Sequence, residues 1–328
     1  MKDRHCDIVV CGAGGFIGGH LVAELRHLSV DVLRAVDLKP VDEWYQRFDD
    51  VENLTLDLQD RAACERAVAS GVREVYNLAS NMGGIGFIEH NKALCMLSVL
   101  INTHLLMASR KAKVQKYLFG SSACVYAADK QTDPNVTALK EEDAYPASPE
   151  DGYGWEKLFS ERMCRHFRED FGLHTCIARY HNVYGPHGTF DGGREKAPAA
   201  ICRKIISAKL SGKHEIEIWG DGNQTRSFMY IDDCIKGTRL MVDRDIPGPL
   251  NIGSDELVSI NQLVDIVEEI AGVKLKRRYN LRAPKGVNGR NSDNTRIQEI
   301  MRWQPSISLR DGMEKTYRWI YDKMSTER

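Results

Sequence analysis

Short apolar runs alternate with longer amphipathic segments along the first half of the chain. The apolar runs predict strands at residues 7–11, 31–37, 53–56, 74–79, 116–121 and 174–179. Between them, apolar residues recur at helical spacing in two sets: Ile17, Leu21, Leu25 and Leu28, then Leu94, Leu97, Ile101, Leu105 and Ala108. Both helices are expected to pack one face on the sheet. This alternation predicts an α/β, Rossmann-type doubly wound parallel sheet.

The pattern changes after about residue 180. Glycine pairs typical of loops precede a predicted helix over residues 197–208, and a predicted strand (228–231) and helix (234–242) then return the chain to the sheet. Ser259 and Gln262 form a capping box for a helix that Gly272 ends. We therefore expect two interleaved lobes. The larger comprises residues 1–180 with 225–255, and the smaller C-terminal lobe comprises 181–224 with 256–328.

Charge and cysteine content narrow the functional class. The 45 basic and 46 acidic residues give a net charge of −1, which favours a small-molecule ligand over nucleic acid or an anionic membrane. The nine cysteines include no Cys-x-x-Cys pair, which favours reduced thiols in a cytoplasmic protein and no metal site. We see no uncharged apolar run of about 18 residues and no signal-peptide core at the start, so we expect no membrane span.

A glycine-rich motif, Gly12-Ala13-Gly14-Gly15-Phe16-Ile17-Gly18, lies between the first predicted strand and helix. Gly12 would allow the tight turn, Gly15 would let a pyrophosphate approach the backbone, and Gly18 would let helix and strand pack closely. Phe16 and Ile17 start the helix, whose free N–H groups attract phosphate. A glycine turn without any ligand is the alternative for the motif alone.

Two acidic residues extend this motif. Asp37 ends the second predicted strand, nineteen residues after Gly18, where its carboxylate can accept hydrogen bonds from both ribose hydroxyls of adenosine. The same charge would repel a 2′-phosphate, so the predicted cofactor is NAD rather than NADP. Asp57 follows the third strand and would reach the adenine, or would serve as a helix cap or a strand-end solvent residue.

Tyr153 and Lys157 are four residues apart on one predicted helical face. An ammonium beside a phenol favours the phenolate, which would make Tyr153 a general base once a positively charged nicotinamide ring adds to the effect. Any helix can show this spacing by chance. Here it follows the glycine motif and a strand that ends in Ser121-Ser122, which favours the functional interpretation.

The motifs taken together resemble the extended short-chain dehydrogenase/reductases that modify nucleotide sugars. The segments that carry the resemblance are the glycine motif, Asn77-Leu78-Ala79, Ser121-Ser122, Tyr153-x-x-x-Lys157 and Arg179-x-x-Asn182-Val183-Tyr184-Gly185-Pro186. The resemblance implies that Tyr153 deprotonates a sugar hydroxyl while hydride passes to NAD⁺. It also implies that Lys157 holds the nicotinamide ribose and that Ser122 orients the substrate.

Within that superfamily the chain is closely similar to the GDP-mannose 3,5-epimerases. The similarity lies in residues 81–88, Cys124, 192–200, 219–228 and 289–294. It implies that Cys124 and Lys196 are the acid and base that invert C3 and C5 of a GDP-sugar after transient oxidation at C4. It further implies a homodimer, and a substrate site formed by Gly83, Asn182, Glu195, Lys196, Lys204, Gln224, Arg226 and Arg290, with Arg290 and Lys204 on the diphosphate.

Alternatives remain open from the residues alone. A nucleotide-sugar 4-epimerase would need Tyr153 and NAD but neither Cys124 nor Lys196, which would then be a buried small hydrophobe and a solvated loop lysine. Arg226 could instead form an ion pair between lobes. A non-catalytic NAD-binding sensor or scaffold would have no use for a tuned Tyr153. A carboxylate that dehydration would need is absent beside Cys124, which disfavours dehydratases.

Overall fold

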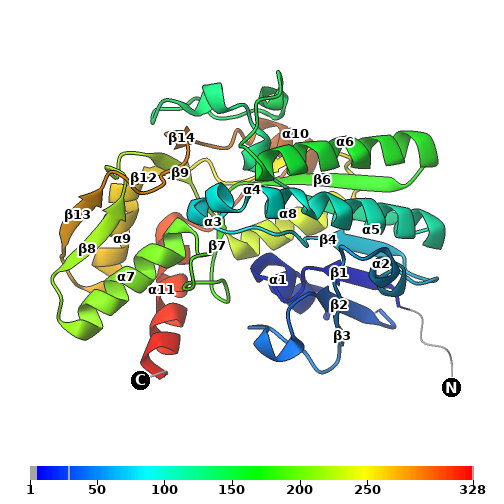
Figure 1. The fold of residues 1–328 in the computed structure, drawn as a ribbon, viewed down its shortest axis with the longest axis horizontal. Helices are drawn as coiled ribbons and strands as arrows, with labels where there is room; N and C mark the ends of the chain where they lie inside the picture. Colours follow the sequence, from blue (N-terminus) through cyan, green and yellow to red (C-terminus); the bar gives the residue numbers. More distant parts are fainter. Residues whose placement is uncertain (1–5, 29, 327–328) are drawn as a thin grey trace.

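A computed structural model describes residues 6–28 and 30–326 of the chain (Figure 1). Its centre is a seven-stranded, all-parallel sheet in the order β11-β6-β5-β4-β1-β2-β3. The strands are β1 (Ile8–Cys11), β2 (Leu33–Asp37), β3 (Glu52–Thr55), β4 (Glu74–Asn77), β5 (Lys116–Ser122), β6 (His174–Tyr180) and β11 (Leu250–Ile252). The predicted Rossmann-type α/β fold is confirmed.

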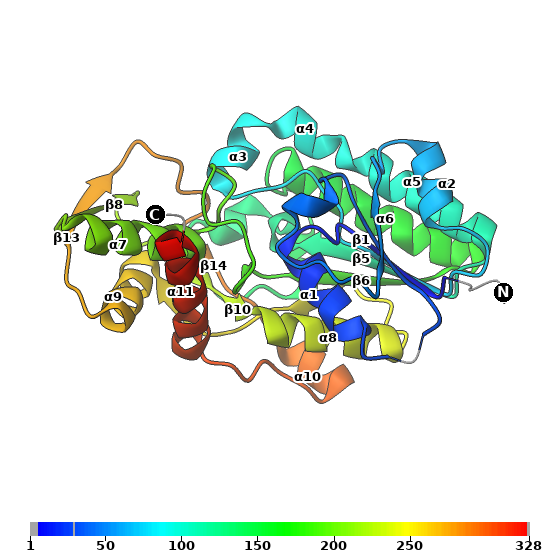
Figure 2. The same cartoon turned by 90° about the horizontal axis from the view of Figure 1, so that it is seen from below.

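Helices cover both faces of this sheet (Figure 2). The side chain of Val10 in β1 packs among those of α1 (Phe16–Leu25) and α8 (Ile231–Asp243). Its neighbour Val9 packs on the other face, with α2 (Arg61–Ala67), α5 (Ser98–Ala112) and α6 (Tyr153–Phe171). The alternation follows from the two-residue period of a strand, and because both faces of the sheet are buried at its centre, the central strand β1 is apolar at every position.

Three residues predicted to pack on the sheet are exposed instead. Leu28 is 42% exposed because α1 ends at Leu25. Leu94 and Leu97 are 36% and 45% exposed because α4 (Lys92–Met96) is a separate short helix from α5. A single helical period therefore does not extend across the break between them. The later residues of the set, Ile101, Leu105 and Ala108, are buried as predicted.

The segment Lys92–Ala112 is long and apolar enough, by length and composition, to cross a membrane, and it is the one such segment among the described residues. Buried core helices of soluble proteins meet the same criteria, and 44% of this segment's apolar window is buried inside the structure. Ile101, Leu105 and Leu106 of α5 belong to the apolar core of the sheet. The packing therefore accounts for the apolar character of the helix.

A smaller lobe lies beyond the carboxyl ends of the strands (Figure 1). Its strands are β8 (Glu215–Trp219) with β13 (Lys276–Asn280), and β9 (Thr225–Ser227) with β12 (Leu257–Ser259) and β14 (Gly289–Arg290). Its helices are α7 (Ala197–Ser211), α9 (Ile260–Ala271) and α11 (Leu309–Thr326). The remaining elements are α3 (Ile85–His90), α10 (Thr295–Met301) and the paired strands β7 (Val183–Tyr184) and β10 (Met229–Tyr230).

The chain crosses between the lobes more than once. The strand predicted at 228–231 is only two residues long and pairs with β7, outside the main sheet, whereas α8 and β11 return the chain to it. Residues 225–227, grouped with the larger lobe by the sequence, pair with β12 and β14 of the smaller one. The capping box of Ser259 and Gln262 is present, and α9 ends at Gly272 in the left-handed conformation.

Candidate functional site

The glycine motif forms a tight turn between β1 and α1. Gly12 has φ +84°, and a Cβ at Gly18 would lie 2.1 Å from the carbonyl oxygen of Gly12. No side chain caps the start of α1 at Gly15, so its first N–H groups are free to face a ligand. The turn therefore requires glycine at positions 12 and 18 and presents free N–H groups that suit a phosphate.

A cavity runs from this turn along the carboxyl ends of the strands, and we call it the glycine-loop cavity. It is lined by residues predicted to bind the cofactor: Gly12, Gly15, Phe16, Ile17, Gly18, Asp37, Asp57, Tyr153 and Lys157. Asp37 accepts a hydrogen bond from the N–H of Lys39 at 3.0 Å, and Asp57 accepts one from Gln59 at 2.9 Å. Each carboxylate keeps lone pairs for a ligand.

Tyr153 and Lys157 lie in the first turns of α6, and both side chains are buried. The ammonium of Lys157 is 5.6 Å from the centre of the Tyr153 ring and 4.8 Å from that of Phe119. Burial raises the pKa of Tyr153 well above its ordinary value, while a hydrogen bond from Ser122 lowers it. In the chain alone, burial therefore outweighs the effect of Lys157 that the spacing predicts.

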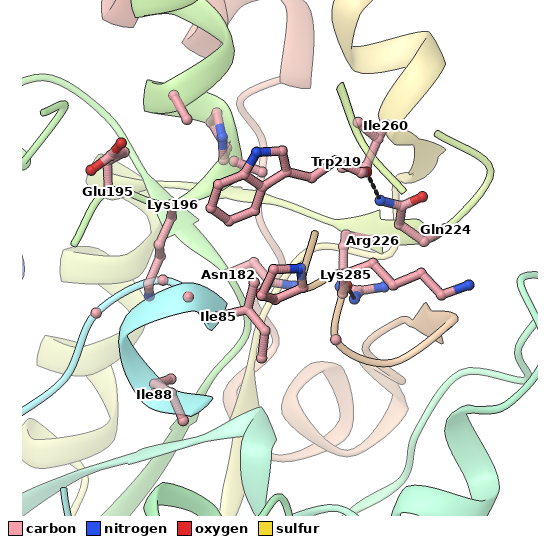
Figure 3. A pocket seen from close by; sticks show the side chains of 18 of the residues that line it. Ile85, Ile88, Asn182, Glu195, Lys196, Trp219, Gln224, Arg226, Ile260 and Lys285 are labelled. Carbon is pink, nitrogen blue, oxygen red and sulfur yellow. Dashed lines mark hydrogen bonds between the residues drawn. The ribbon is translucent and has the colours of Figure 1, made fainter. Parts of the chain in front are cut away.

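A second cavity lies between the lobes, and we call it the inter-lobe cavity (Figure 3). The structure brings together on its walls every residue predicted to contact the substrate: Gly83, Asn182, Glu195, Lys196, Lys204, Gln224, Arg226 and Arg290. Cys124, Ser122 and Tyr153 line it too. Ser122, Tyr153 and Lys196 are among the residues that line both cavities, so the two cavities are joined beside these side chains.

Cys124 and Lys196 face the inter-lobe cavity from different lobes. Cys124 follows β5 in a short 3₁₀ turn, and Lys196 is the N-cap of α7. Burial raises the pKa of the Cys124 thiol to about 11, with the charge of Glu150 adding to it and that of Arg290 opposing it. Burial also lowers the pKa of Lys196. Both shifts favour the neutral forms, so the thiol can donate a proton and the amine can accept one.

Two cations predicted for the substrate site form hydrogen bonds within the protein. Lys204 donates to the carbonyl of Glu217 at 2.8 Å and lies over the ring of Trp219. Arg226 donates to the carbonyls of Thr225, Lys285 and Val287 in its own lobe, and among the described residues it forms no ion pair between the lobes.

The side chains of Gln224, Asn182 and Glu195 also form hydrogen bonds within the protein. Gln224 donates to the carbonyl of Trp219 at 2.9 Å, and its Oε1 is buried without a partner in the described structure. Asn182 donates to the carbonyl of Ser227, and Glu195 accepts from Gly193 and Arg203.

Two neighbours of Arg290 were missed in the sequence, one buried and one partly buried. Gln131 and Glu150 both contact Arg290, at 2.6 and 3.3 Å. No motif or periodicity identifies them, because their contact with Arg290 spans about half of the chain. Trp219 was noted only as part of a similar segment, and the structure places it on the cavity wall beside Gln224 (Figure 3).

Comparison with known proteins agrees with this geometry. The model of the NAD dependent epimerase/dehydratase family matches residues 8–253. The chain belongs to this family. GDP-mannose 3,5-epimerase 1 of Oryza sativa subsp. japonica is 42% identical over 98% of the chain and 83% of its own length. GDP-mannose 3,5-epimerase of Arabidopsis thaliana is 41% identical over 98% of the chain and 84% of its own length. The resemblance that the motifs indicated is confirmed.

Solved structures of the family share the fold. UDP-glucose 4-epimerase of Thermotoga maritima, with UDP-glucose, has a TM-score of 0.84 at 24% identity, with 97% of this chain and 99% of that chain covered. UDP-glucuronic acid 4-epimerase of Bacillus cereus, in complex with UDP-glucuronic acid and NAD, has a TM-score of 0.80 at 26% identity and the same coverage. The protein is therefore an NAD-dependent enzyme of the epimerase type, and its glycine-loop cavity fits that cofactor.

Proposed function

We propose that this enzyme is a GDP-mannose 3,5-epimerase, which oxidises the sugar at C4, inverts C3 and C5, and reduces C4 again. The observation that carries the proposal is the meeting of the two cavities. Tyr153 and Ser122 lie where the cavities join, and Cys124 and Lys196 lie on the wall of the inter-lobe cavity. Groups for oxidation and groups for proton transfer thus surround one space.

Oxidation begins at Tyr153. Its phenolate accepts the proton of the C4 hydroxyl, while Ser122 donates to the sugar oxygen and Lys157 holds the ribose beside the reaction centre. NAD⁺, when bound, would supply the hydride acceptor and a positive charge. Burial raises the pKa of Tyr153 in the chain alone, and a positive charge nearby would oppose that effect and favour the phenolate.

Inversion then depends on Cys124 and Lys196. A ketone at C4 makes the hydrogens on C3 and C5 acidic, because loss of either proton gives an enolate. Inverting a carbon requires a base on one face and an acid on the other. The amine of Lys196 takes the proton and the thiol of Cys124 delivers another to the opposite face, and the roles reverse where the geometry of the sugar demands it. Tyr153 finally returns its proton to the C4 oxygen.

The diphosphate lies among cations in this proposal. Lys204, Arg226 and Arg290 all line the inter-lobe cavity, and Gln224 offers a buried acceptor for a base or sugar N–H or O–H group. Lys204 and Arg226 keep N–H donors beyond those used on the protein, since a lysine has three and an arginine five. The relatives that act on GDP-mannose, at 41% and 42% identity, support guanine as the base.

The experiment that tests the proposal is turnover of GDP-mannose in D₂O, followed by NMR of the recovered sugars. Every inversion exchanges a carbon-bound proton with solvent, so deuterium is expected at both C3 and C5. UDP-glucose serves as the matched substrate control. A 4-epimerase returns the same hydride to C4 and incorporates no deuterium, so an inverted C4 without label would replace our proposal with that activity.

We further propose that the enzyme is a cytosolic homodimer. Apolar side chains are exposed along the outer face of the helices α4, α5 and α6: Leu94, Leu97, Leu100, Met107, Trp155 and Phe159. Two such faces packed together would remove these side chains from water, which is the ordinary reason for a helical dimer interface. All nine cysteines are free, which supports a reducing compartment.

A further inference from the structure

The guanidinium of Arg290 is held on three sides by one segment of the larger lobe and the turn before α6. Its Nε donates to Oε1 of Gln131 at 2.6 Å, its Nη2 donates to Oε2 of Glu150 at 3.3 Å, and its Nη1 lies 3.4 Å from the sulfur of Cys124. Arg290 is only 6% exposed. Two other side chains therefore orient a positive charge that lies 3.4 Å from the thiol.

The backbone around Arg290 is fixed to the same segment. The N–H of Asn288 donates to the carbonyl of Gln131 at 3.0 Å, and the N–H of Leu139 donates to the carbonyl of Asn291, also at 3.0 Å. A Cβ at Gly289 would lie 2.2 Å from the carbonyl oxygen of Asp133, so only glycine allows this approach. These contacts fix the β14 segment of the smaller lobe in the position that places Arg290 beside Cys124.

Gln131 can hold Arg290 in only one orientation. Its side chain is 1% exposed, and its Nε2 donates to the carbonyls of Tyr126 and Ala127 at 3.1 and 3.3 Å. Because two carbonyls require the amide nitrogen, the amide oxygen must face Nε of Arg290. Rotation of the guanidinium away from Cys124 would leave that buried oxygen without a donor, which is costly.

We propose that Gln131 is a positioning residue for proton transfer at Cys124: it fixes the guanidinium of Arg290 against the sulfur, so that Arg290 stabilises the thiolate present when the proton is on the sugar carbon. The S–H bond breaks as a C–H bond forms, and the reverse step restores the thiol. This inference rests on the proposed function for its substrate, but the contact between Arg290 and the thiol does not depend on which sugar binds.

Several charged and titratable groups face the sulfur, and their effects differ in sign. They are Glu150 before α6, Tyr153 on α6, Lys196 at the start of α7, Arg226 on β9 and Arg290 on β14. Burial raises the pKa of Cys124 and the charge of Glu150 raises it further, whereas Arg290 and a hydrogen bond with Ser122 lower it. Gln131 affects the thiol only by orienting Arg290, which favours the thiolate, whereas the negative charge of Glu150 disfavours the thiolate.

The two neighbours of Arg290 therefore predict opposite results. Gln131→Met keeps the size of the side chain but removes the acceptor for Nε, so Arg290 is released from the sulfur and the thiolate becomes rarer. Glu150→Gln keeps an oxygen for Nη2 but removes the negative charge, so the thiolate becomes more common. If the two substitutions only loosened the packing around Cys124, the reactivity of the thiol would shift in the same direction in both variants.

The test is the pH dependence of Cys124 alkylation by iodoacetamide, followed by peptide mass spectrometry, on the protein with NAD added and no sugar. Only the thiolate reacts. At pH 8, Gln131→Met should slow alkylation about tenfold, the effect of a pKa one unit higher, and Glu150→Gln should accelerate it by a few-fold up to about tenfold. Gln298→Met, on exposed α10, is the matched control and should match the parent protein.

A second measurement links the contact to the reaction. With GDP-mannose in D₂O, Gln131→Met should reduce deuterium entry at C3 and C5 by about tenfold while transient NADH formation stays at the level of the parent. Alkylation rates equal to the parent in both variants, or shifted in the same direction, would overturn the inference. If Gln131→Met does not fold, the Glu150→Gln variant decides the question: alkylation no faster than in the parent protein would overturn the inference. Opposite shifts in alkylation without any deuterium uptake by the parent would overturn the proposed function and leave the positioning of Arg290 standing.

Discussion

The ammonium nitrogen of Lys157 lies 3.6 Å from Oε2 of Glu156, and both side chains are buried, with 3% and 1% of their surfaces exposed. Oε1 of Glu156 accepts a hydrogen bond from Ser160 at 2.9 Å, whereas Oε2 has no hydrogen-bond partner in the described structure. The charge of Glu156 also raises the pKa of Tyr153. Lys157 should favour the phenolate of Tyr153, but it lies beside Glu156, whose negative charge disfavours that phenolate.

Glu156→Gln should shift the acidic limb of the pH profile for transient NADH formation to lower pH, by up to about one unit. Tyr153 must be deprotonated to act as a base, so the rate falls below its pKa. Removing the charge of Glu156 lowers that pKa, and the limb follows it downward. Stopped-flow absorbance with GDP-mannose across pH measures the shift. Glu169→Gln, at the exposed end of α6, is the control, and an identical limb in Glu156→Gln and Glu169→Gln would contradict the expectation.

The parts of this site that were predictable are local in sequence. The glycine turn needs a positive φ at Gly12 and no side chain at Gly18, and both requirements are visible in the order of the residues. Asp37 ends β2 because the apolar run that forms the strand stops there, and Tyr153 and Lys157 lie on one face because a helix has 3.6 residues per turn. The residues that line the inter-lobe cavity came from resemblance, not from spacing.

The parts that could not be predicted depend on contacts across the chain. Gln131 and Arg290 are 159 positions apart in the sequence, and their hydrogen bond depends on the pairing of β14, which carries Arg290, with β9. The exposure of Leu94 and Leu97 follows from the break between α4 and α5, and no glycine or proline marks that break. Likewise, burial determines the pKa of Tyr153 in the chain alone, and burial is a property of the folded chain rather than of a motif.

Asp37→Ser should narrow the preference for NAD over NADP, by about tenfold or more in the ratio of dissociation constants. The carboxylate lines the glycine-loop cavity, where it would repel a 2′-phosphate and accept hydrogen bonds from ribose hydroxyls. Calorimetric titration of both cofactors measures the ratio. Asp42→Ser, exposed on the same β2–β3 connection, should leave it unchanged. Equal affinities for NAD and NADP in the parent protein would be inconsistent with this role of Asp37.

Phe159→Glu should convert the proposed dimer into a monomer. Phe159 is 55% exposed on α6, one of the helices of the proposed interface, and a charge buried there without a partner would cost several kcal/mol, or on the order of 10²-fold or more in the dimer dissociation constant. Light scattering coupled to size-exclusion chromatography reads the mass. Leu281→Glu alters another exposed apolar residue, in the smaller lobe, and should leave the mass alone. A monomeric parent protein would rule out this interface.

Cys124→Ser and Lys196→Ala should separate proton transfer at carbon from oxidation at C4. Both variants keep Tyr153, Lys157 and the glycine-loop cavity, so a transient NADH signal should persist. Deuterium entry at C3 and C5 should fall by about 10² or more, the usual effect of removing a positioned acid or base. Tyr153→Phe is the reciprocal control: it should lose NADH formation and deuterium entry together, because no ketone forms to acidify C3 and C5. Deuterium uptake by either Cys124→Ser or Lys196→Ala at the rate of the parent would remove that residue from the chemistry.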